Sequence, residues 1–193
     1  MPQNPVMMMR NIEEKVIVAG FGGQGVMLMG QILSYTATEE GLNTVWIPSY
    51  GPETRGGTAN CSVIISSEMI NSPVVPVPNT IIAMNKPSLE KFEPKLTPGG
   101  TALVNSDLIK DYTFRDDIIV YSVPCNAMAL SLGNLKVANM IMLGAYLEST
   151  HLFEVQAIEK TFNKLFVGDK AKLITLNKNA LSAGIEVVKK QRI

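Results

Sequence analysis

The sequence predicts an α/β fold, a Rossmann-like three-layer α/β/α sandwich whose sheet is mostly parallel, with a mixed sheet left open. Three observations predict it. Short apolar runs with the composition of strands alternate with helical patterns over the first two-thirds of the chain. The first of these runs leads into glycines spaced as G-x-G-x-x-G, a pattern typical of a strand–loop–helix unit. The last third is mostly helical, and its segment 137–147 is apolar on nearly every side, which indicates burial.

The expected elements begin with residues 15–19 (KVIVA), a β-branched run that ends at a glycine and reads as a buried strand. After the glycine loop an apolar stripe at helical spacing starts at Val26, and Gly41 ends that helix. Further strands are expected at residues 44–48, 58–66, 80–84, 101–105 and 118–123. Residues 72–79 contain three prolines, so they are an extended connection or an edge and not a central strand.

A short helix is expected from Pro87, and Pro98-Gly99-Gly100 predicts a turn. Two amphipathic helices close the chain, with stripes formed by Val155, Ile158, Phe162, Leu165 and Phe166 and by Leu181, Gly184, Ile185 and Val188. We expect residues 12–193 to form a single domain after a flexible N-terminal segment, residues 1–11.

Composition excludes several classes of function. Lys and Arg total 17, as do Asp and Glu, so the chain lacks the basic balance of a nucleic-acid-binding protein. No apolar run approaches the roughly 20 residues of a membrane span. The two cysteines, far apart and without a C-x-x-C motif, exclude a Cys-ligated cluster or zinc within this chain and favour the cytoplasm. The 46% hydrophobic content fits either an associating surface or a large core.

The glycine loop of residues 20–25 has two interpretations. Between a strand and a helix, glycines allow backbone N–H groups to approach a phosphate at the positive helix end. They also allow a strand and a helix to pack closely without any bound ligand. No Gly-Lys-Ser/Thr follows, so an NTPase P-loop is not expected. The candidate residues of this loop are Gly20, Gly22, Gly23, Gln24 and Gly25.

A second glycine-rich loop follows the second strand. That strand ends in Pro48 and Ser49, where a dinucleotide-binding unit would have an Asp or Glu for the ribose. We expect both loops to leave the carboxyl ends of neighbouring strands and to face each other. In this loop Arg55 is a candidate clamp for a phosphate or carboxylate, or the partner of Glu53 in a surface ion pair. The candidate interface or ligand-facing residues here are Tyr50, Gly51, Glu53, Arg55, Gly56 and Gly57.

The chain offers no catalytic constellation. Cys125 precedes an expected helix, but no histidine lies near it to act as a base, so we do not expect a nucleophile there. Asn139 is the one strongly polar residue inside the apolar segment 137–147, and a buried Asn needs partners, so we expect it to hold the helix to a loop or to another subunit. We therefore expect no catalytic residue, no metal ligand and no reaction by this chain alone.

The motifs, in this order and spacing, resemble the gamma subunit of 2-oxoacid:ferredoxin (acceptor) oxidoreductases. The resemblance covers nearly the whole chain, roughly residues 16–184. The form of residues 46–53 (WIPSYGPE) and 59–61 (ANC) is most similar to the 2-oxoglutarate branch, whereas Thr54 and Cys125 depart from the usual pattern. The segments that carry the resemblance are Gly20-Phe21-Gly22-Gly23-Gln24-Gly25, Ser49 through Gly57, Ser72-Pro73, Ala83 through Ser88, Pro98-Gly99-Gly100, Gly133-Asn134 and Asn139-Met140.

This resemblance implies a division of labour. Such enzymes convert a 2-oxoacid, coenzyme A and an oxidised acceptor into acyl-CoA, CO2 and reduced acceptor. It implies alpha, beta and delta partner subunits that carry thiamine diphosphate and [4Fe-4S] clusters, with ferredoxin or flavodoxin as acceptor. The gamma subunit binds no cofactor alone, packs against its partners and helps to frame the approach of substrate or coenzyme A.

Three functional readings stay open on the sequence. The first is a gamma subunit for 2-oxoglutarate, with pyruvate, branched-chain or indolepyruvate enzymes as alternatives. The second is a free-standing nucleotide-binding protein that uses residues 20–25. The third is a structural scaffold whose glycine loops serve packing alone.

Overall fold

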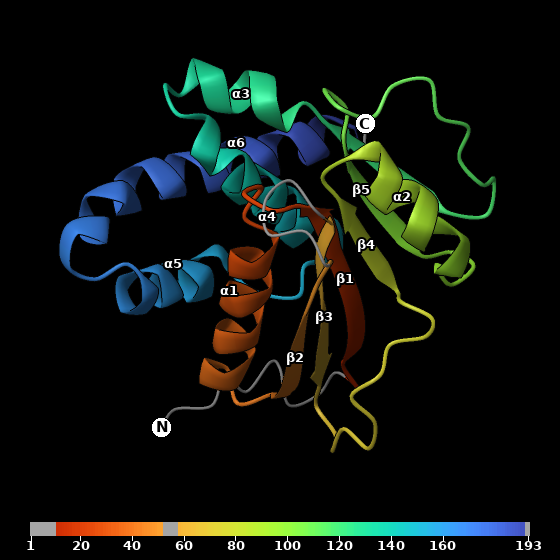
Figure 1. Ribbon diagram of the computed structural model, residues 1–193. Coiled ribbons are helices and arrows are strands. Elements are labelled where there is room, and N and C mark those ends of the chain that lie inside the picture. Colours follow the sequence, from red (N-terminus) through yellow and green to blue (C-terminus); the bar gives the residue numbers. More distant parts are fainter. Residues whose placement is uncertain (1–10, 52–57, 192–193) are drawn as a thin grey trace.

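The structure, a computed structural model, describes residues 11–51 and 58–191. A six-stranded sheet in the order β2-β3-β1-β4-β5-β6 forms its centre (Figure 1). The strands are β1 (Glu13–Phe21), β2 (Asn43–Tyr50), β3 (Thr58–Ser66), β4 (Thr80–Ala83), β5 (Thr101–Asn105) and β6 (Ile119–Val123).

Five of the six strands run in the same direction. β1, β4, β5 and β6 pair in parallel. β3 lies between β1 and β2 and is antiparallel to both. The expectation of an α/β fold with a mostly parallel sheet is confirmed, and β3 is what makes the sheet mixed.

Helices cover both faces of the sheet, although unequally, and together with the sheet they form the three layers seen in Figure 1. The larger apolar cluster joins α1, α4, α5 and α6 to one face, and a smaller cluster joins α2 to the other. The helices are α1 (Val26–Glu39), α2 (Lys86–Phe92), α3 (Cys125–Ser131), α4 (Ala138–Thr150), α5 (Val155–Leu165) and α6 (Ile174–Gln191), with short 3-10 helices η2 (Glu93–Lys95), η3 (Leu135–Val137) and η4 (Gly168–Leu173).

Helix α4 is the buried centre of the helical layer, as its apolar sequence predicts. Every residue from Ala138 to Leu147 is buried. It crosses α6 in backbone contact, because a Cβ at Gly144 would overlap the carbonyl group of Leu181 and a Cβ at Gly184 would overlap that of Ile141. The two glycines therefore set how closely these helices pack.

We predict that Gly184→Ala destabilises the protein by at least roughly 2 kcal/mol, since the added methyl group must push α6 away from α4. The exposed helix residue Ser182 provides the control, because Ser182→Ala adds no atom to the crossing. Urea unfolding of both variants measures the effect. Equal midpoints for Gly184→Ala and wild type would show that the helices do not pack this closely.

A partly buried carboxyl group lies on β1. The Oε1 atom of Glu14 on β1 accepts a hydrogen bond from the Thr80 hydroxyl at 2.6 Å. Burial raises the pKa of Glu14, and the bond from Thr80 opposes the shift in part. Above the ordinary pKa of 4.5 and up to the raised one, the folded chain holds a proton that the unfolded chain has released. Stability from this group therefore falls as pH rises through that window.

We predict that Glu14→Gln is more stable than wild type at pH 7–8 and that the difference disappears below about pH 4. The glutamine keeps an acceptor for Thr80 and carries no charge to desolvate. Chemical unfolding across this pH range measures it, with Glu13→Gln on the exposed face as the control. A Glu14→Gln variant that is less stable than wild type at pH 8 would contradict the prediction.

Candidate functional site

The candidate site lies where the parallel strands β1, β4, β5 and β6 end together. In α/β sheets this carboxyl edge is where ligands bind, because the loops there can approach a ligand while the strands hold them in place. Four connections meet at this edge: the glycine loop after β1 and the segments that lead from β4 into α2, from β5 toward β6 and from β6 into α3.

The glycine loop is a tight turn that opens α1. The Gln24 amide nitrogen donates to the carbonyl oxygen of Phe21 at 3.1 Å. Gly23 has φ 96° and Gly25 has φ 74°, in the left-handed region that favours glycine. Gly25 is also the N-cap residue of α1. The local sequence therefore places the positive end of a 14-residue helix at the edge of the sheet.

Two of the glycines serve packing. A Cβ at Gly20 would lie 2.7 Å from Oε1 of Gln24, and one at Gly25 would overlap the side chain of Asn139. The Asn139 amide donates to the Gly25 carbonyl oxygen at 3.4 Å, so this residue ties α4 to the loop as the sequence suggests. Gly22 and Gly23 are exposed, and a Cβ at Gly23 would meet no atom within 4 Å.

Gln24 joins the glycine loop to the end of β4. Its Oε1 accepts hydrogen bonds from the Phe21 amide nitrogen at 2.6 Å and from the Asn85 side chain at 3.0 Å. Its Nε2 donates to the carbonyl oxygen of Met84 at 3.2 Å. Asn85 in turn caps α2 by accepting from the Ser88 amide nitrogen at 3.0 Å. One glutamine therefore fixes the loop against the next strand.

Asn105 extends these contacts to β5 and α3. Its buried side-chain amide donates to Oδ1 of Asn126 at 3.1 Å and reaches the Met84 carbonyl oxygen at 3.5 Å. Since Oδ1 of Asn126 accepts this bond, its Nδ2 group is left to donate elsewhere. We call the four side chains Gln24, Asn85, Asn105 and Asn126 the amide chain.

A pocket of about 420 Å³ opens beside the amide chain, and we call it the amide pocket. Its lining contains one cation, Lys136, and no carboxylate. Asn134 uses its Oδ1 to accept from the Lys136 amide nitrogen at 3.0 Å, which leaves its Nδ2 as a donor. These groups offer donors to acceptor or anionic groups of a ligand, and the buried Oδ1 of Asn139, which has no partner in the described part of the chain, adds one acceptor. The lining residues are Gly23, Gln24, Met84, Asn126, Asn134, Leu135, Lys136, Ala138 and Asn139.

The groups for acid–base or nucleophilic chemistry do not assemble here. Cys125 is fully buried, and burial raises the pKa of its thiol far above the usual range. Cys61 is buried against α1, where burial raises its pKa to about 11. Among residues 11–51 and 58–191 no group of three His, Cys, Asp or Glu could hold a metal ion. Within the same ranges no helix has the length and apolar character needed to cross a bilayer.

The structure separates the two predicted loops. Tyr50 is 70% exposed, and Gly51 donates from its amide nitrogen to the Thr58 carbonyl oxygen at 2.7 Å. The expectation that the loops leave neighbouring strands is wrong, because β3 lies between β1 and β2. Both strands still end at the same edge, about 10 Å apart from strand spacing. The remaining candidates of the second loop, Glu53, Arg55, Gly56 and Gly57, lie outside the described residues.

The sequence indicated Gly23, Gln24 and Asn139 but not Asn126 and Lys136 of the amide pocket, nor Asn85 and Asn105 of the amide chain. Asn85 and Asn105 stand at or just after strand ends, which is the position where α/β proteins place ligand-binding groups. That signal was available. Asn126 and Lys136 carry no local signal, since they reach the site only because α3 and η3 return to this edge.

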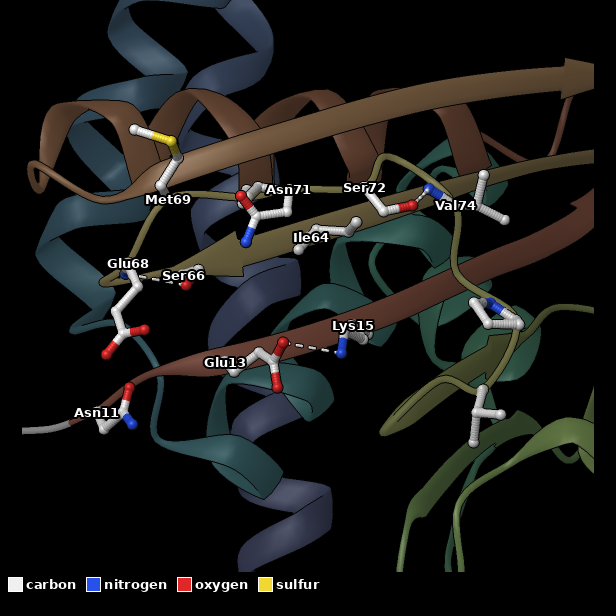
Figure 2. Close-up of a pocket in the computed structure, with 13 residues that line it drawn as sticks. Asn11, Glu13, Lys15, Ile64, Ser66, Glu68, Met69, Asn71, Ser72 and Val74 are labelled. Atoms are coloured by element: carbon white, nitrogen blue, oxygen red, sulfur yellow. Dashed lines mark hydrogen bonds and ion pairs between the residues drawn. The ribbon is translucent and has the colours of Figure 1, made fainter.

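A second concavity of about 590 Å³, the outer hollow, lies at the opposite edge of the sheet. Figure 2 shows Glu13 and Lys15 of β1 paired at 2.8 Å beside Ile64 of β3. Met69 and Val74, from the loop after β3, line it with 81% and 66% of their surface exposed. Its charges are largely neutralised, and none of the predicted site residues lines it. We therefore take the amide pocket as the candidate site.

We predict that Gln24→Met lowers stability by about 1–3 kcal/mol, because the Phe21 amide nitrogen, the Asn85 side chain and the Met84 carbonyl oxygen each lose a partner. Thermal unfolding measures the loss. Gln156→Met, an exposed position on α5, controls for the change in residue type. If the two variants are equally stable, Gln24 does not hold the edge together.

Comparison with known families and curated proteins gives a consistent result. The family model described as pyruvate ferredoxin/flavodoxin oxidoreductase matches residues 15–187. The ketoisovalerate oxidoreductase subunit VorA of Methanothermobacter thermautotrophicus is 40% identical over 90% of this chain. The chain spans only 36% of that relative's length. The 2-oxoglutarate synthase subunit KorC of Methanothermobacter marburgensis is 36% identical and covers 92% of this chain and 97% of its own.

Solved structures agree with these matches. The gamma subunit of a keto/oxoacid ferredoxin oxidoreductase from Geobacter sulfurreducens is 28% identical and superposes with a TM-score of 0.78 over 92% of this chain and 99% of its own. The 2-oxoglutarate:ferredoxin oxidoreductase of Magnetococcus marinus, with 2-oxoglutarate, coenzyme A and succinyl-CoA bound, gives a TM-score of 0.83 at 21% identity. That match covers 94% of this chain and 32% of the other, and it shows a shared fold.

Proposed function

The chain belongs to the pyruvate ferredoxin/flavodoxin oxidoreductase family, and from this premise we propose that it is the gamma component of a 2-oxoacid:ferredoxin oxidoreductase. The single observation that carries the proposal is the family match over residues 15–187, supported by the likeness to a solved gamma subunit. The reaction is the oxidative decarboxylation of a 2-oxoacid with coenzyme A to acyl-CoA and CO2. Ferredoxin or flavodoxin takes the electrons, and the complex works in the cytoplasm.

In this proposal the chemistry belongs to the alpha, beta and delta partners, which hold thiamine diphosphate and [4Fe-4S] clusters. The contribution of this chain is recognition. Its carboxyl edge presents side-chain amides, a helix N-terminus and one lysine, and these groups bind and orient but do not transfer protons. The exposed apolar side chains of the outer hollow, among them Met69, are in keeping with a chain that functions inside an assembly.

We propose coenzyme A as the ligand of the amide pocket. Its phosphates would bind Lys136 and the exposed part of the glycine loop, and its amide and adenine groups would bind the side chains of Asn126 and Asn134. A 2-oxoglutarate:ferredoxin oxidoreductase that contains this fold in 32% of the matched chain is known with coenzyme A bound. Arg55 in the second loop is a further candidate for a phosphate contact, and Arg55→Ala in the assembled complex tests that part separately.

The 2-oxoacid that we propose first is 2-oxoglutarate. Residues 46–53 and 59–61 resemble that branch, and a 2-oxoglutarate synthase subunit is 36% identical over nearly its full length. A branched-chain 2-oxoacid is the second candidate, because a ketoisovalerate oxidoreductase subunit is 40% identical. The preference for 2-oxoglutarate therefore rests on residues 46–53 and 59–61.

We predict that the complex purified with this chain reduces ferredoxin with 2-oxoglutarate and coenzyme A at a kcat/KM at least about tenfold above that for 3-methyl-2-oxobutanoate, a difference of ~1.4 kcal/mol. A ferredoxin-reduction assay with each acid measures it. A preference for the branched acid would move the assignment to the second candidate. No activity with any 2-oxoacid would overturn the proposed function.

We predict that Lys136→Ala raises the KM for coenzyme A in the assembled complex by about tenfold, or ~1.4 kcal/mol, because one charge-assisted contact is lost. The KM for the 2-oxoacid and the assembly of the complex stay unchanged. Lys160→Ala, an exposed lysine on α5, is the matched control. An unchanged KM for coenzyme A in Lys136→Ala would remove this pocket from the proposal.

A further inference from the structure

A third cavity of about 330 Å³ lies among the helices next to the amide pocket, and we call it the helix pocket. It is bounded by α1, the start of α4 and the segment from the end of α5 through η4 into α6. It shares the wall formed by Asn134, Lys136 and Asn139 with the amide pocket and extends away from the glycine loop. Its volume is within the range of small-ligand sites.

The walls of the helix pocket are mostly apolar. Leu28 comes from α1, Met140 from α4, and Leu173 from η4. Leu165 and Phe166 close the side at the end of α5. These side chains suit an aliphatic chain or an aromatic ring, whose transfer from water would be favourable.

The charged side chains that line the helix pocket are both cations. Lys136 and Lys170 line it, and no Asp or Glu does. In the described part of the chain, neither lysine pairs with a carboxylate. Lys170 does not line the amide pocket, so it distinguishes the two cavities.

Asn177 adds a polar side chain to the wall of the helix pocket. Its side chain lines the helix pocket and only 6% of the residue is exposed. Its amide atoms are not among the buried polar atoms without a partner in residues 11–51 and 58–191, so the amide keeps an accessible surface on which a partner can bind. A ligand oxygen in the pocket would supply that partner.

We propose that the helix pocket binds a small carboxylic acid with an aliphatic or aromatic tail. The carboxylate is held by Lys136, Lys170 and the amide of Asn177, and the tail packs against the leucines and Phe166. An inorganic anion would leave the apolar walls unused, and a neutral apolar molecule would leave the lysines unused. This site shares Asn134 and Lys136 with the proposed coenzyme A contact, is distinguished from it by Lys170 and Asn177, and goes beyond the proposed function.

Isothermal titration of the full chain with hexanoate and phenylacetate tests the proposal, with hexanamide and phenylacetamide as neutral analogues. We expect saturable binding of one acid per chain, and at least about tenfold weaker binding of the amides. Lys170→Ala weakens binding of the acids by about tenfold, whereas Lys172→Ala on the same segment does not. Both lysines are exposed, so neither variant threatens the fold.

The proposal is overturned if neither acid shows saturable binding up to roughly 10 mM, which corresponds to less than ~3 kcal/mol of affinity. Equal affinity for the acids and the amides would also overturn it. So would equal effects of Lys170→Ala and Lys172→Ala on the binding of the acids. Measuring the KM for coenzyme A in the assembled complex with Lys170→Ala distinguishes this proposal from the proposal that coenzyme A binds the amide pocket. If the proposed function fails while acids still bind through Lys170, the helix pocket stands by itself.

Discussion

The side-chain amides that link the carboxyl ends of β1, β4 and β5 are the interaction on which the candidate site depends. Gln24 satisfies the backbone of the glycine loop and of β4 at once, and Asn105 connects the same carbonyl group to Asn126 on α3. Gln24, Asn85 and Asn105 each have more than one hydrogen-bond partner, so the position of one loop depends on the others. Because these groups are half-buried or buried, losing a partner leaves a polar atom without water to replace it.

This arrangement gives two glycines of the glycine loop a packing role. Gly20 and Gly25 are there so that Gln24 and Asn139 can approach the backbone, and Gly23 lines the amide pocket. The absent ribose-binding acid is explained by topology, since β2 pairs with antiparallel β3 and does not follow β1 in the sheet. The chain keeps the strand–loop–helix unit of a dinucleotide site, and Gln24 of that unit lies beside amides and a lysine that other elements supply. Recognition within an assembly fits this set of groups better than catalysis.

Much of the fold was predictable because it depends on local patterns. The strand expected at 58–66 has those bounds in the structure, and the strand at 101–105 does too. The buried helix α4 follows from the apolar run 137–147. The order of the strands was not predictable, because the antiparallel insertion of β3 depends on pairings between distant segments. Contacts between distant segments also create the site around Asn126 and Lys136 and the helix pocket, so the sequence did not indicate them. The walls of the helix pocket come from residues 28 to 177.

We propose above all that the amide pocket of this chain recognises coenzyme A inside a 2-oxoacid oxidoreductase. The most direct measurement is an experimental structure of the assembled complex with coenzyme A bound. We expect ligand density against Gly23, Asn126 and Lys136, with the hydrogen bonds of the amide chain intact beneath it. Coenzyme A bound elsewhere, with this pocket filled by side chains of another subunit, would contradict the proposal that the amide pocket binds coenzyme A.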